Sequence, residues 1–567
     1  MFPGNDEIPV TNRTTELADC AGSWFYDERY DCWCLEDILY TEKASAPKFQ
    51  RLSVYAPKAY MKPDGTPDRA GSCGKYTAET APVVFANNAA GYMQMPHTWL
   101  GGPRCDAETF LRRGMVYVTA GCRGRESRDA EGNAVGKAPA TLVDLKTVVR
   151  FLRHNRQALP GSMDRIVTVG TSAGGAMSAL LGTTGDNERY LPYLREAGAF
   201  LDESDAVFAS QCYCPIIDLD HADQAYEWCF GADLTCEDSP AGPAETMTPF
   251  QEALSRGLAK RYIGYVNGLG LRHPETGEPL TLGEDGRSGA FYEYLTDCLG
   301  RSASKFLRLL EQGALKLKCT PEDYLKGNYT EEVPGPPPGP KDPDLHHVGP
   351  GANLPQGGPD EKPKTMGEML CRPPKGTPWR PLPENLVSRP GKPKGAWLSW
   401  DGSKAGVRDL DAYVLNHRRR MKPCTSFDTL RCLSAENQVF GTTEQDYTHY
   451  NPAIGPAVRE LADRFPEEAE RYGRAYDVDG DDALALRRYL INPMNFAGTA
   501  EKSTMAEHFR IRLGAADADT SLSVAMTLAV KLANAGIDTD YALVWDLPHC
   551  DADYPGEFPD WIDSLCC

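Results

Sequence analysis

The sequence of 567 residues lacks the features that would mark a membrane protein or a nucleic-acid-binding protein. No run approaches the roughly 18 consecutive apolar residues that a membrane-spanning helix requires. Basic side chains are outnumbered, 60 against 80 acidic ones, and the resulting net charge of -20 repels nucleic acids and anionic membrane surfaces. We therefore expect neither a nucleic acid nor a membrane among its partners.

The start of the chain, MFPGNDEIPVTNRTTELADC, has neither the basic beginning nor the apolar segment of a signal peptide. We expect a cytoplasmic protein, unless a signal peptide has been removed. Cysteine is also sparse, because 18 in a chain of this length are too few for a disulfide scaffold. The pairs Cys32/Cys34 and Cys212/Cys214 have one residue between them rather than the two of a zinc ribbon, so we expect buried thiols and no metal site.

What the sequence does contain is an alternation of strand-like and helix-like segments. Short apolar, β-branched runs bounded by glycine or proline are typical of buried parallel strands, and such runs occupy residues 82–87, 114–121 and 165–170. Helical periodicity lies between the last two, in TLVDLKTVVRFL. This alternation predicts a doubly wound α/β domain with a mostly parallel sheet.

A long insertion interrupts the alternation. Residues 206–217 read as one more strand, after which the pattern is lost. It returns with a strand at residues 508–513, an apolar helix, and a last strand at residues 541–549. We therefore expect the insertion to lie between the sixth and seventh strands of the sheet.

The expected domain boundaries follow from this reading. Residues 1–217 and 505–567 form a discontinuous core, and residues 218–504 form an inserted cap or lid. Within the cap, a Pro/Gly-rich section at about residues 331–394 includes VPGPPPGPKDPD. Such a composition predicts an extended, mobile loop without a packed core of its own.

The segment GTSAGG supplies the first candidate catalytic residue. Gly170, Ser172 and Gly174 match G-x-S-x-G between a predicted strand and a predicted helix, the context in which a serine becomes an exposed nucleophile on a sharp turn. The alternative is a glycine-rich turn that binds phosphate. Phosphate binding is disfavoured because the segment fits neither G-x-G-x-x-G nor the P-loop pattern, which needs a lysine.

Two backbone amides would stabilise the oxyanion that forms when Ser172 attacks an acyl carbon. One belongs to Ala173, where the predicted helix begins. The other belongs to the loop Asn-Ala-Ala-Gly that follows the strand at residues 82–87, and Ala90 is our candidate within it. Small residues in this loop permit a close approach of the backbone to a substrate.

A histidine and an acid should follow the serine in the chain in a fold of this kind. Of the ten histidines, His549 alone stands just after the last predicted strand, whereas His508 stands at a strand start, on the opposite edge of the sheet. Asp517 and Asp519 both lie in the bend after the preceding strand, in ADADTS, and further aspartates flank the histidine. Spacing alone does not choose between Asp517 and Asp519.

With GTSAGGAMSALLG, ADADTS and DLPHCD in place, the chain resembles the bacterial tannases of the tannin acyl hydrolase family, within the α/β-hydrolase superfamily. The resemblance runs over most of the core and part of the cap. It implies an α/β-hydrolase fold with a large cap, in which Ser172 is the nucleophile, His549 the base and Asp517 the acid. Asp519 is then free for another role.

The resemblance also implies a binding site for the galloyl ring. The family holds the phenolic hydroxyls with a lysine and a glutamate of the cap and with the second aspartate of the D-x-D pair. In MKPCTSFDTLRCLSAENQVFG, Lys422 and Glu436 look like this pair, and Asp519 is the second aspartate. From the sequence alone, the two cap residues would instead be solvated side chains.

We therefore predict a serine esterase that hydrolyses galloyl ester bonds in tannins and alkyl gallates and releases gallic acid through an acyl-enzyme. No metal and no organic cofactor is expected, and the expected partners are small-molecule gallate esters and tannins. The alternative is a feruloyl or broad aryl-ester carboxylesterase with the same triad. A third hypothesis, a catalytically silent scaffold that only binds partners, is disfavoured because all three triad positions are filled.

Overall fold

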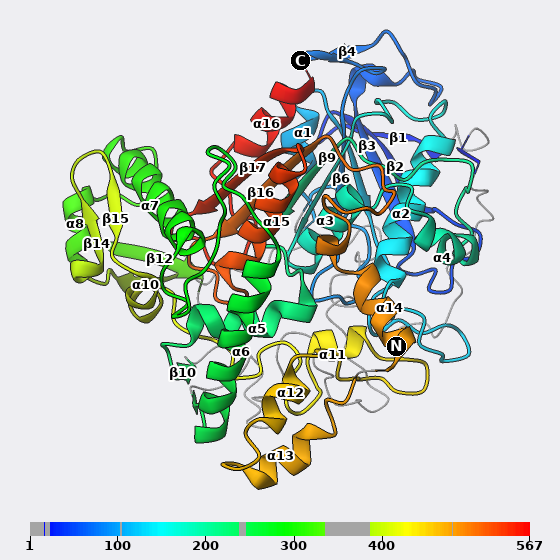
Figure 1. Ribbon diagram of the computed structural model, residues 1–567. Coiled ribbons are helices and arrows are strands. Elements are labelled where there is room, and N and C mark those ends of the chain that lie inside the picture. Colours follow the sequence, from blue (N-terminus) through cyan, green and yellow to red (C-terminus); the bar gives the residue numbers. More distant parts are fainter. Residues whose placement is uncertain are drawn as a thin grey trace, which may run out of the picture.

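A mixed sheet forms the centre of the molecule (Figure 1). The computed structural model describes residues 16–17, 23–102, 105–236, 245–334, 386–478 and 480–566. Within these residues, nine strands form the main sheet in the order β1-β2-β3-β7-β6-β8-β9-β16-β17. The strands are β1 (Phe25–Asp27), β2 (Cys32–Leu39), β3 (Arg51–Pro57), β6 (Val83–Asn87), β7 (Val116–Ala120), β8 (Ile166–Thr171), β9 (Ala209–Tyr213), β16 (His508–Gly514) and β17 (Asp538–Val544).

The sheet has a parallel part and an antiparallel edge. The six strands from β7 to β17 in the sheet order run parallel to one another, whereas β1, β2 and β3 pair antiparallel and join at β7. Every residue of β6, β7 and β9 is buried, as expected for strands that helices cover on both faces. The predicted doubly wound, mostly parallel sheet of an α/β-hydrolase is confirmed.

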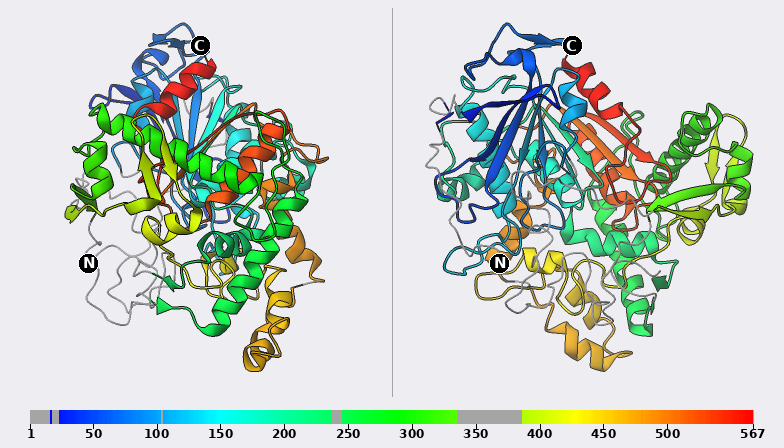
Figure 2. Two further views of the ribbon diagram at one scale, coloured as in Figure 1. Left: turned by 60° about the vertical axis from the view of Figure 1, so that its left-hand side comes forward. Right: turned by 180° about the vertical axis from the view of Figure 1, so that it is seen from behind.

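Helices cover both faces of this sheet (Figure 2). Those of the core are α1 (Ala107–Leu111), α2 (Ala140–His154), α3 (Ala173–Thr183), α4 (Leu191–Glu196), α15 (Leu522–Asn534) and α16 (Glu557–Cys566). Helix α2 is buried along almost its whole length and contacts both α3 and α4. The covering layer thus holds the strands and their carboxyl ends in fixed positions.

The predicted position of the insertion within the strand order is wrong. In the described part of the chain, β9 is the seventh strand of the main sheet and β16 the eighth, so the insertion follows the seventh strand. The miscount arises at the N-terminal hairpin. Strand β1 has only three residues, and β2 carries the acidic pair Glu36 and Asp37 at a break in its pairing with β3, which hides the alternation.

Among the described residues between β9 and β16, most of the regular structure is helical. The helices there are α5 (Leu219–Phe230), α6 (Pro249–Gly268), α7 (Ala290–Glu311), α8 (Pro321–Lys326), α10 (Leu410–Asn416), α11 (Ala435–Val439), α12 (Ile454–Arg459), α13 (Pro466–Gly473) and α14 (Asp482–Leu490). Helices α12 and α13 extend away from the sheet, in yellow and orange in Figure 1. By contrast, α5 contacts α15 and α7 contacts β17, so part of the inserted segment packs directly on the core.

Short two-stranded ribbons complete the inserted segment. Strand β12 (Thr330–Pro334) pairs antiparallel with β13 (Leu386–Pro390), and β14 (Leu398–Trp400) pairs with β15 (Ala405–Val407). Most of the Pro/Gly-rich section predicted to be a mobile loop lies outside the described residues, and only its two ends belong to the β12–β13 ribbon and the segment after it. None of the helices in the described ranges combines the length and apolar character needed to cross a bilayer.

A buried ion network ties α2 to the loop before β9. The ammonium of Lys146 lies 2.6 Å from one carboxylate oxygen of Asp205, and the guanidinium of Arg150 donates to the other at 2.7 Å. All three side chains are buried. Burial alone would raise the pKa of Asp205, but the two cations outweigh it and lower that pKa.

Replacing Asp205 by alanine should destabilise the protein by about 3–5 kcal/mol, because two buried cations lose their counter-ion. The free energy of unfolding, measured by urea denaturation, tests this. The control is Glu108→Ala, which removes one partner of the solvent-exposed pair Glu108–Arg112 and should change stability by less than about 0.5 kcal/mol. Equal stabilities of the two variants would contradict the assignment.

Candidate active site

Ser172 stands on a strained turn between β8 and α3. Its φ of 63° and ψ of -122° place a residue with a side chain in a conformation that L-residues rarely adopt. The neighbouring glycines are required by space. A Cβ on Gly170 would lie 2.5 Å from the carbonyl oxygen of Gly174, and a Cβ on Gly174 would lie 2.9 Å from that of Ala89. The G-x-S-x-G pattern therefore has a steric cause in this fold.

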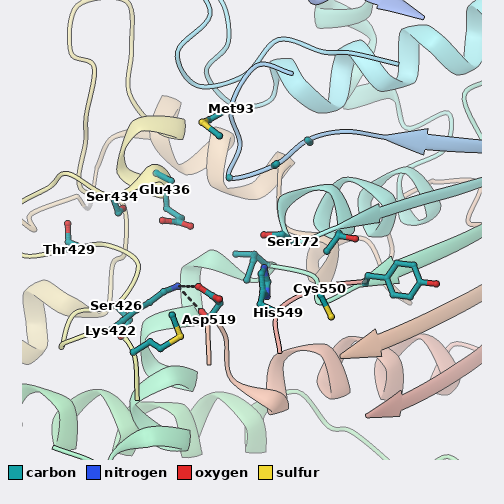
Figure 3. Close-up of a pocket in the computed structure, with 18 of the residues that line it drawn as sticks. Met93, Ser172, Lys422, Ser426, Thr429, Ser434, Glu436, Asp519, His549 and Cys550 are labelled. Atoms are coloured by element: carbon teal, nitrogen blue, oxygen red, sulfur yellow. Dashed lines mark hydrogen bonds and ion pairs between the residues drawn. The ribbon is translucent and has the colours of Figure 1, made fainter. Parts of the chain in front are cut away.

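A cavity of about 1760 Å³ opens above this turn. Ser172 lines it together with His549, at the edge of the sheet where the parallel strands end. The opposite wall comes from the inserted segment, including α11 and the loop after α10. Figure 3 shows Ser172 and His549 beside one another, facing the side chains of that wall.

Asp517 and His549 form a hydrogen-bonded pair. The loop after β16 carries Asp517 and the loop after β17 carries His549, and the imidazole Nδ1 lies 2.7 Å from a carboxylate oxygen of Asp517. Burial opposes a charge on His549, but the Asp517 carboxylate outweighs it and holds the pKa of His549 well above its ordinary value of 6.5. Burial likewise would raise the pKa of Asp517, yet the adjacent imidazole lowers it.

The structure therefore pairs the histidine with the first aspartate of the D-x-D sequence. Asp519 occupies a different place, where its backbone N–H donates to the second carboxylate oxygen of Asp517 at 2.8 Å. This bond helps to fix the Asp517 carboxylate, whose side chain is fully buried. His508, at the start of β16, pairs instead with Asp538 at 2.7 Å and lies away from the cavity lining.

The two predicted oxyanion donors lie directly after Ser172 and in the loop after β6. Ala173 is the first residue of α3 and is buried directly after Ser172. Ala90 lines the cavity in the loop after β6, where its carbonyl accepts the N–H of Met93 at 3.0 Å. Arg125 holds this loop by donating from Nε to the carbonyl of Gly91 at 2.9 Å. The role of both amides stays a prediction.

Three charged side chains that line the cavity are the residues expected to bind a phenolic ring. The ammonium of Lys422 donates to the backbone carbonyl of Asp519 at 2.8 Å and lies 3.6 Å from its carboxylate. Glu436, at the first turn of α11, lines the same cavity. In Figure 3 Asp519 lies between Lys422 and His549, and Lys422 and Glu436 lie farther from Ser172.

Cys214 is a neighbour of the triad that the sequence interpretation missed. The Cys214 sulfur, a carboxylate oxygen of Asp517 and a ring nitrogen of His549 lie within 4.8 Å of one another. Burial raises the pKa of the Cys214 thiol to about 12. Its sulfur accepts the N–H of Gly514 at 3.4 Å. The signal was its position directly after β9, at the same sheet edge as the other loops, but the sequence suggested only a buried thiol.

This cluster is also the group of three that could hold a metal ion among the residues that the structure describes. Thiolate and imidazole are ligands that a soft divalent ion prefers. An ion there would compete with the hydrogen bond between His549 and Asp517.

A second thiol, Cys550, lines the cavity. Thr171, whose hydroxyl bonds the carboxylate of Asp551, precedes the serine.

Comparison with known proteins places this geometry in context. Residues 109–219 match the family BD-FAE. The native tannin acyl hydrolase from Lactobacillus plantarum is 29% identical, with a TM-score of 0.70 and 94% of each chain covered. The tannase of Fusobacterium nucleatum is 28% identical, with a TM-score of 0.70 and coverage of 94% of this chain and 95% of that one. No curated protein matches the sequence.

A tannin acyl hydrolase solved as a mercury derivative is 30% identical, again with a TM-score of 0.70 and 94% of each chain covered. These likenesses run over nearly the whole chain, core and inserted segment together. The chain belongs to the tannase, or tannin acyl hydrolase, family of α/β-hydrolases.

Proposed function

We propose that this protein is a serine esterase that hydrolyses galloyl esters, both alkyl gallates and tannins, and releases gallic acid. The observation that carries the proposal is the cavity, which Lys422, Glu436 and Asp519 line together with Ser172 and His549. A nucleophile and its base on one wall need an acyl group held by the other. The opposite wall offers charged groups among its apolar side chains, which favours a ring that carries hydroxyls.

The chemistry of that wall suits three adjacent phenols. Each phenolic O–H is a donor that a carboxylate accepts, and Glu436 and Asp519 supply two carboxylates. The ammonium of Lys422 can donate to a phenolic oxygen and favours its ionised form. Two solved relatives, which are 29% identical to this chain, hold ethyl gallate and 3,4-dihydroxybenzoate respectively. Their ligands share the adjacent hydroxyls to which this argument applies.

The proposed reaction uses the groups already described. Ser172 attacks the ester carbonyl while His549 takes the hydroxyl proton, and the amides of Ala173 and Ala90 stabilise the oxyanion. The C–O bond to the alcohol breaks, and His549 returns the proton to the departing alkoxide oxygen. Asp517 keeps the imidazole in the correct tautomer and balances its positive charge. A water molecule, deprotonated by the same imidazole, then releases gallate and regenerates the serine.

The size of the cavity bears on the alcohol part of the substrate. At about 1760 Å³ it exceeds what one galloyl group fills, since small-ligand pockets typically measure about 300–1,000 Å³. The space is lined by both the core and the inserted segment. A bulky alcohol, such as a galloylated polyol, therefore has room beside the ring, and this supports tannins as well as alkyl gallates.

Replacing Ser172 by alanine should reduce kcat/KM for methyl gallate by about 10³-fold or more, because the attacking oxygen is gone. Release of gallic acid measures this. A fluorophosphonate should label the native protein at Ser172 and leave Ser172→Ala unlabelled. Retained turnover in the variant would refute Ser172 as the nucleophile. A native protein that neither hydrolyses methyl gallate nor reacts with the probe would instead support the silent-scaffold alternative.

Lys422→Ala, Glu436→Ala and Asp519→Ala should each lower kcat/KM for methyl gallate by about 10- to 100-fold, and for phenyl acetate by less than about 3-fold. The reason is that the hydroxyls of the gallate ring lose a hydrogen-bonding partner in these variants, whereas the acetyl group of phenyl acetate has no hydroxyl to lose one. The control is Glu444→Ala, an exposed glutamate of the inserted segment that does not line the cavity. Equal losses on both substrates would indicate a generic esterase.

A panel of methyl gallate, methyl protocatechuate and ethyl ferulate separates the proposal from its alternative, because each of the last two lacks or masks a ring hydroxyl. The native protein should prefer methyl gallate. A preference for ethyl ferulate would instead assign it as a feruloyl or broad aryl-ester carboxylesterase.

The pH dependence follows from the raised pKa of His549. The imidazole acts as a base only when neutral, so kcat/KM should rise with pH, and the midpoint of this acid limb should lie above 6.5. In Asp517→Asn the carboxylate that raises this pKa is lost and burial remains, so the midpoint should fall along with the activity. Phenyl acetate, which has no ionisable group, is the substrate of choice. A native midpoint below 6.5 would contradict the assignment.

A further inference from the structure

One face of α5 holds the loop that carries Lys422. This loop, residues 417–434 between α10 and α11, is called the cap loop below. Asp223, Tyr226 and Glu227 are spaced i, i+3 and i+4, so they share a face of the helix. All three side chains are fully buried. Buried polar groups are stable only when their hydrogen-bonding capacity is used, so the partners of these side chains are informative.

Tyr226 connects the two loops that supply the proposed ring-binding residues. Its hydroxyl accepts the backbone N–H groups of Met421 and Lys422, both at 3.2 Å, and donates to the backbone carbonyl of Ala518 at 3.0 Å. A phenolic hydroxyl has one donor and two acceptor sites, so all three are used. Ala518 stands directly before Asp519, and the hydroxyl therefore joins the cap loop to the core loop beside both residues.

Glu227 and its partner Arg420 hold the backbone carbonyl of Lys422. The carboxylate of Glu227 pairs with the guanidinium of Arg420 and also accepts the hydroxyl of Ser426 at 3.2 Å. Arg420 in turn donates from Nε to the backbone carbonyl of Lys422 at 2.9 Å. Both backbone groups of Lys422 are thus held, its N–H by Tyr226 and its carbonyl through Glu227.

Asp223 orders the segment on which the Lys422 ammonium rests. Its carboxylate accepts the consecutive backbone N–H groups of Ser426, Phe427 and Asp428 at 2.7, 2.9 and 3.1 Å. The ring of Phe427 lies under the Lys422 ammonium, with 4.3 Å between the nitrogen and the ring centroid. The side chain of Lys422 is therefore directed by contacts that begin at α5.

We propose that Tyr226 is a positioning residue for substrate selection, whose hydroxyl sets the place of Lys422 relative to Asp519 and so determines how well the cavity accepts a polyhydroxylated acyl ring. Neither the nucleophile nor its base depends on this hydroxyl for its own hydrogen bonds. Its removal should affect ring recognition more than ester cleavage. This inference rests on the proposed function, because it assigns Lys422 and Asp519 to the ring.

The test is Tyr226→Phe, which removes one oxygen and keeps the buried ring. We expect kcat/KM for methyl gallate to fall about 10- to 100-fold, mainly through KM, because a misplaced ammonium costs binding of the ring. Turnover of phenyl acetate should change by less than about 3-fold. Peptides that contain Met421 and Lys422 should exchange their amide hydrogens faster than in the native protein, because these two amides lose their acceptor.

Tyr262→Phe is the matched control. Tyr262 of α6 is equally buried, and its hydroxyl bonds the side chain of Ser523 at 2.7 Å without contacting the cap loop. It should show a similar loss of thermal stability, with unchanged selectivity and unchanged exchange at Lys422. A variant Tyr226→Phe that behaves as this control does would reduce Tyr226 to a structural residue.

Lys422→Ala separates the failure of this inference from the failure of the proposed function. If Lys422→Ala loses gallate selectivity and Tyr226→Phe keeps it, the positioning role of Tyr226 is refuted and the proposed function stands. If the native protein itself does not prefer methyl gallate to phenyl acetate, the proposed function is refuted, and the role of Tyr226 in ring selection falls with it.

Discussion

The parallel register of four strands is the constraint on which the active site depends. Strands β8, β9, β16 and β17 run side by side in one direction, and Thr171, Tyr213 and Arg512 are successive partners across them. Because parallel strands deliver their carboxyl ends to the same edge, the residues that follow them meet there. Ser172, Cys214, Asp517 and His549 all follow this rule, although hundreds of residues separate the first from the last.

The proposed recognition of the acyl group depends on a second level of organisation, in which α5 joins the inserted segment to the core. The helix begins soon after β9 and directs Asp223, Tyr226 and Glu227 at the cap loop. Buried carboxylates are costly unless each oxygen has partners, and here the partners are backbone amides, hydroxyls and a guanidinium. The buried carboxylates therefore keep their hydrogen-bonding partners only while the loop holds one conformation. The wall proposed to bind the acyl group is therefore held in place by the hydrogen bonds of the residues behind it.

Much of this architecture can be predicted from the sequence, because the signals are local. The largely apolar runs of β6 and β7 mark buried parallel strands, and the glycines around Ser172 mark the sharp turn, since larger side chains do not fit. His549 can be found from its place after the last strand. The N-terminal hairpin is not predicted from the sequence, because β1 has too few residues to show a strand pattern.

The remainder depends on contacts between distant parts of the chain. Asp517 and Asp519 are two residues apart in one bend, so only the folded loop decides which carboxylate meets the imidazole. Tyr226 reads as an ordinary apolar residue of a helix, and its partner Ala518 lies 292 residues away. The position of Cys214 beside the triad likewise depends on loops from β16 and β17 that no local pattern connects. Lys422 and Glu436 are predicted as ring-binding residues from the family resemblance alone.

The ribbon of β12 and β13 has a thermodynamic consequence. Five paired positions, from Thr330 with Pro390 to Pro334 with Leu386, bring two distant points of the chain together. Since closing a loop of twice the length costs only about 0.6 kcal/mol more, a change in the number of residues between Pro334 and Leu386 costs the fold little free energy.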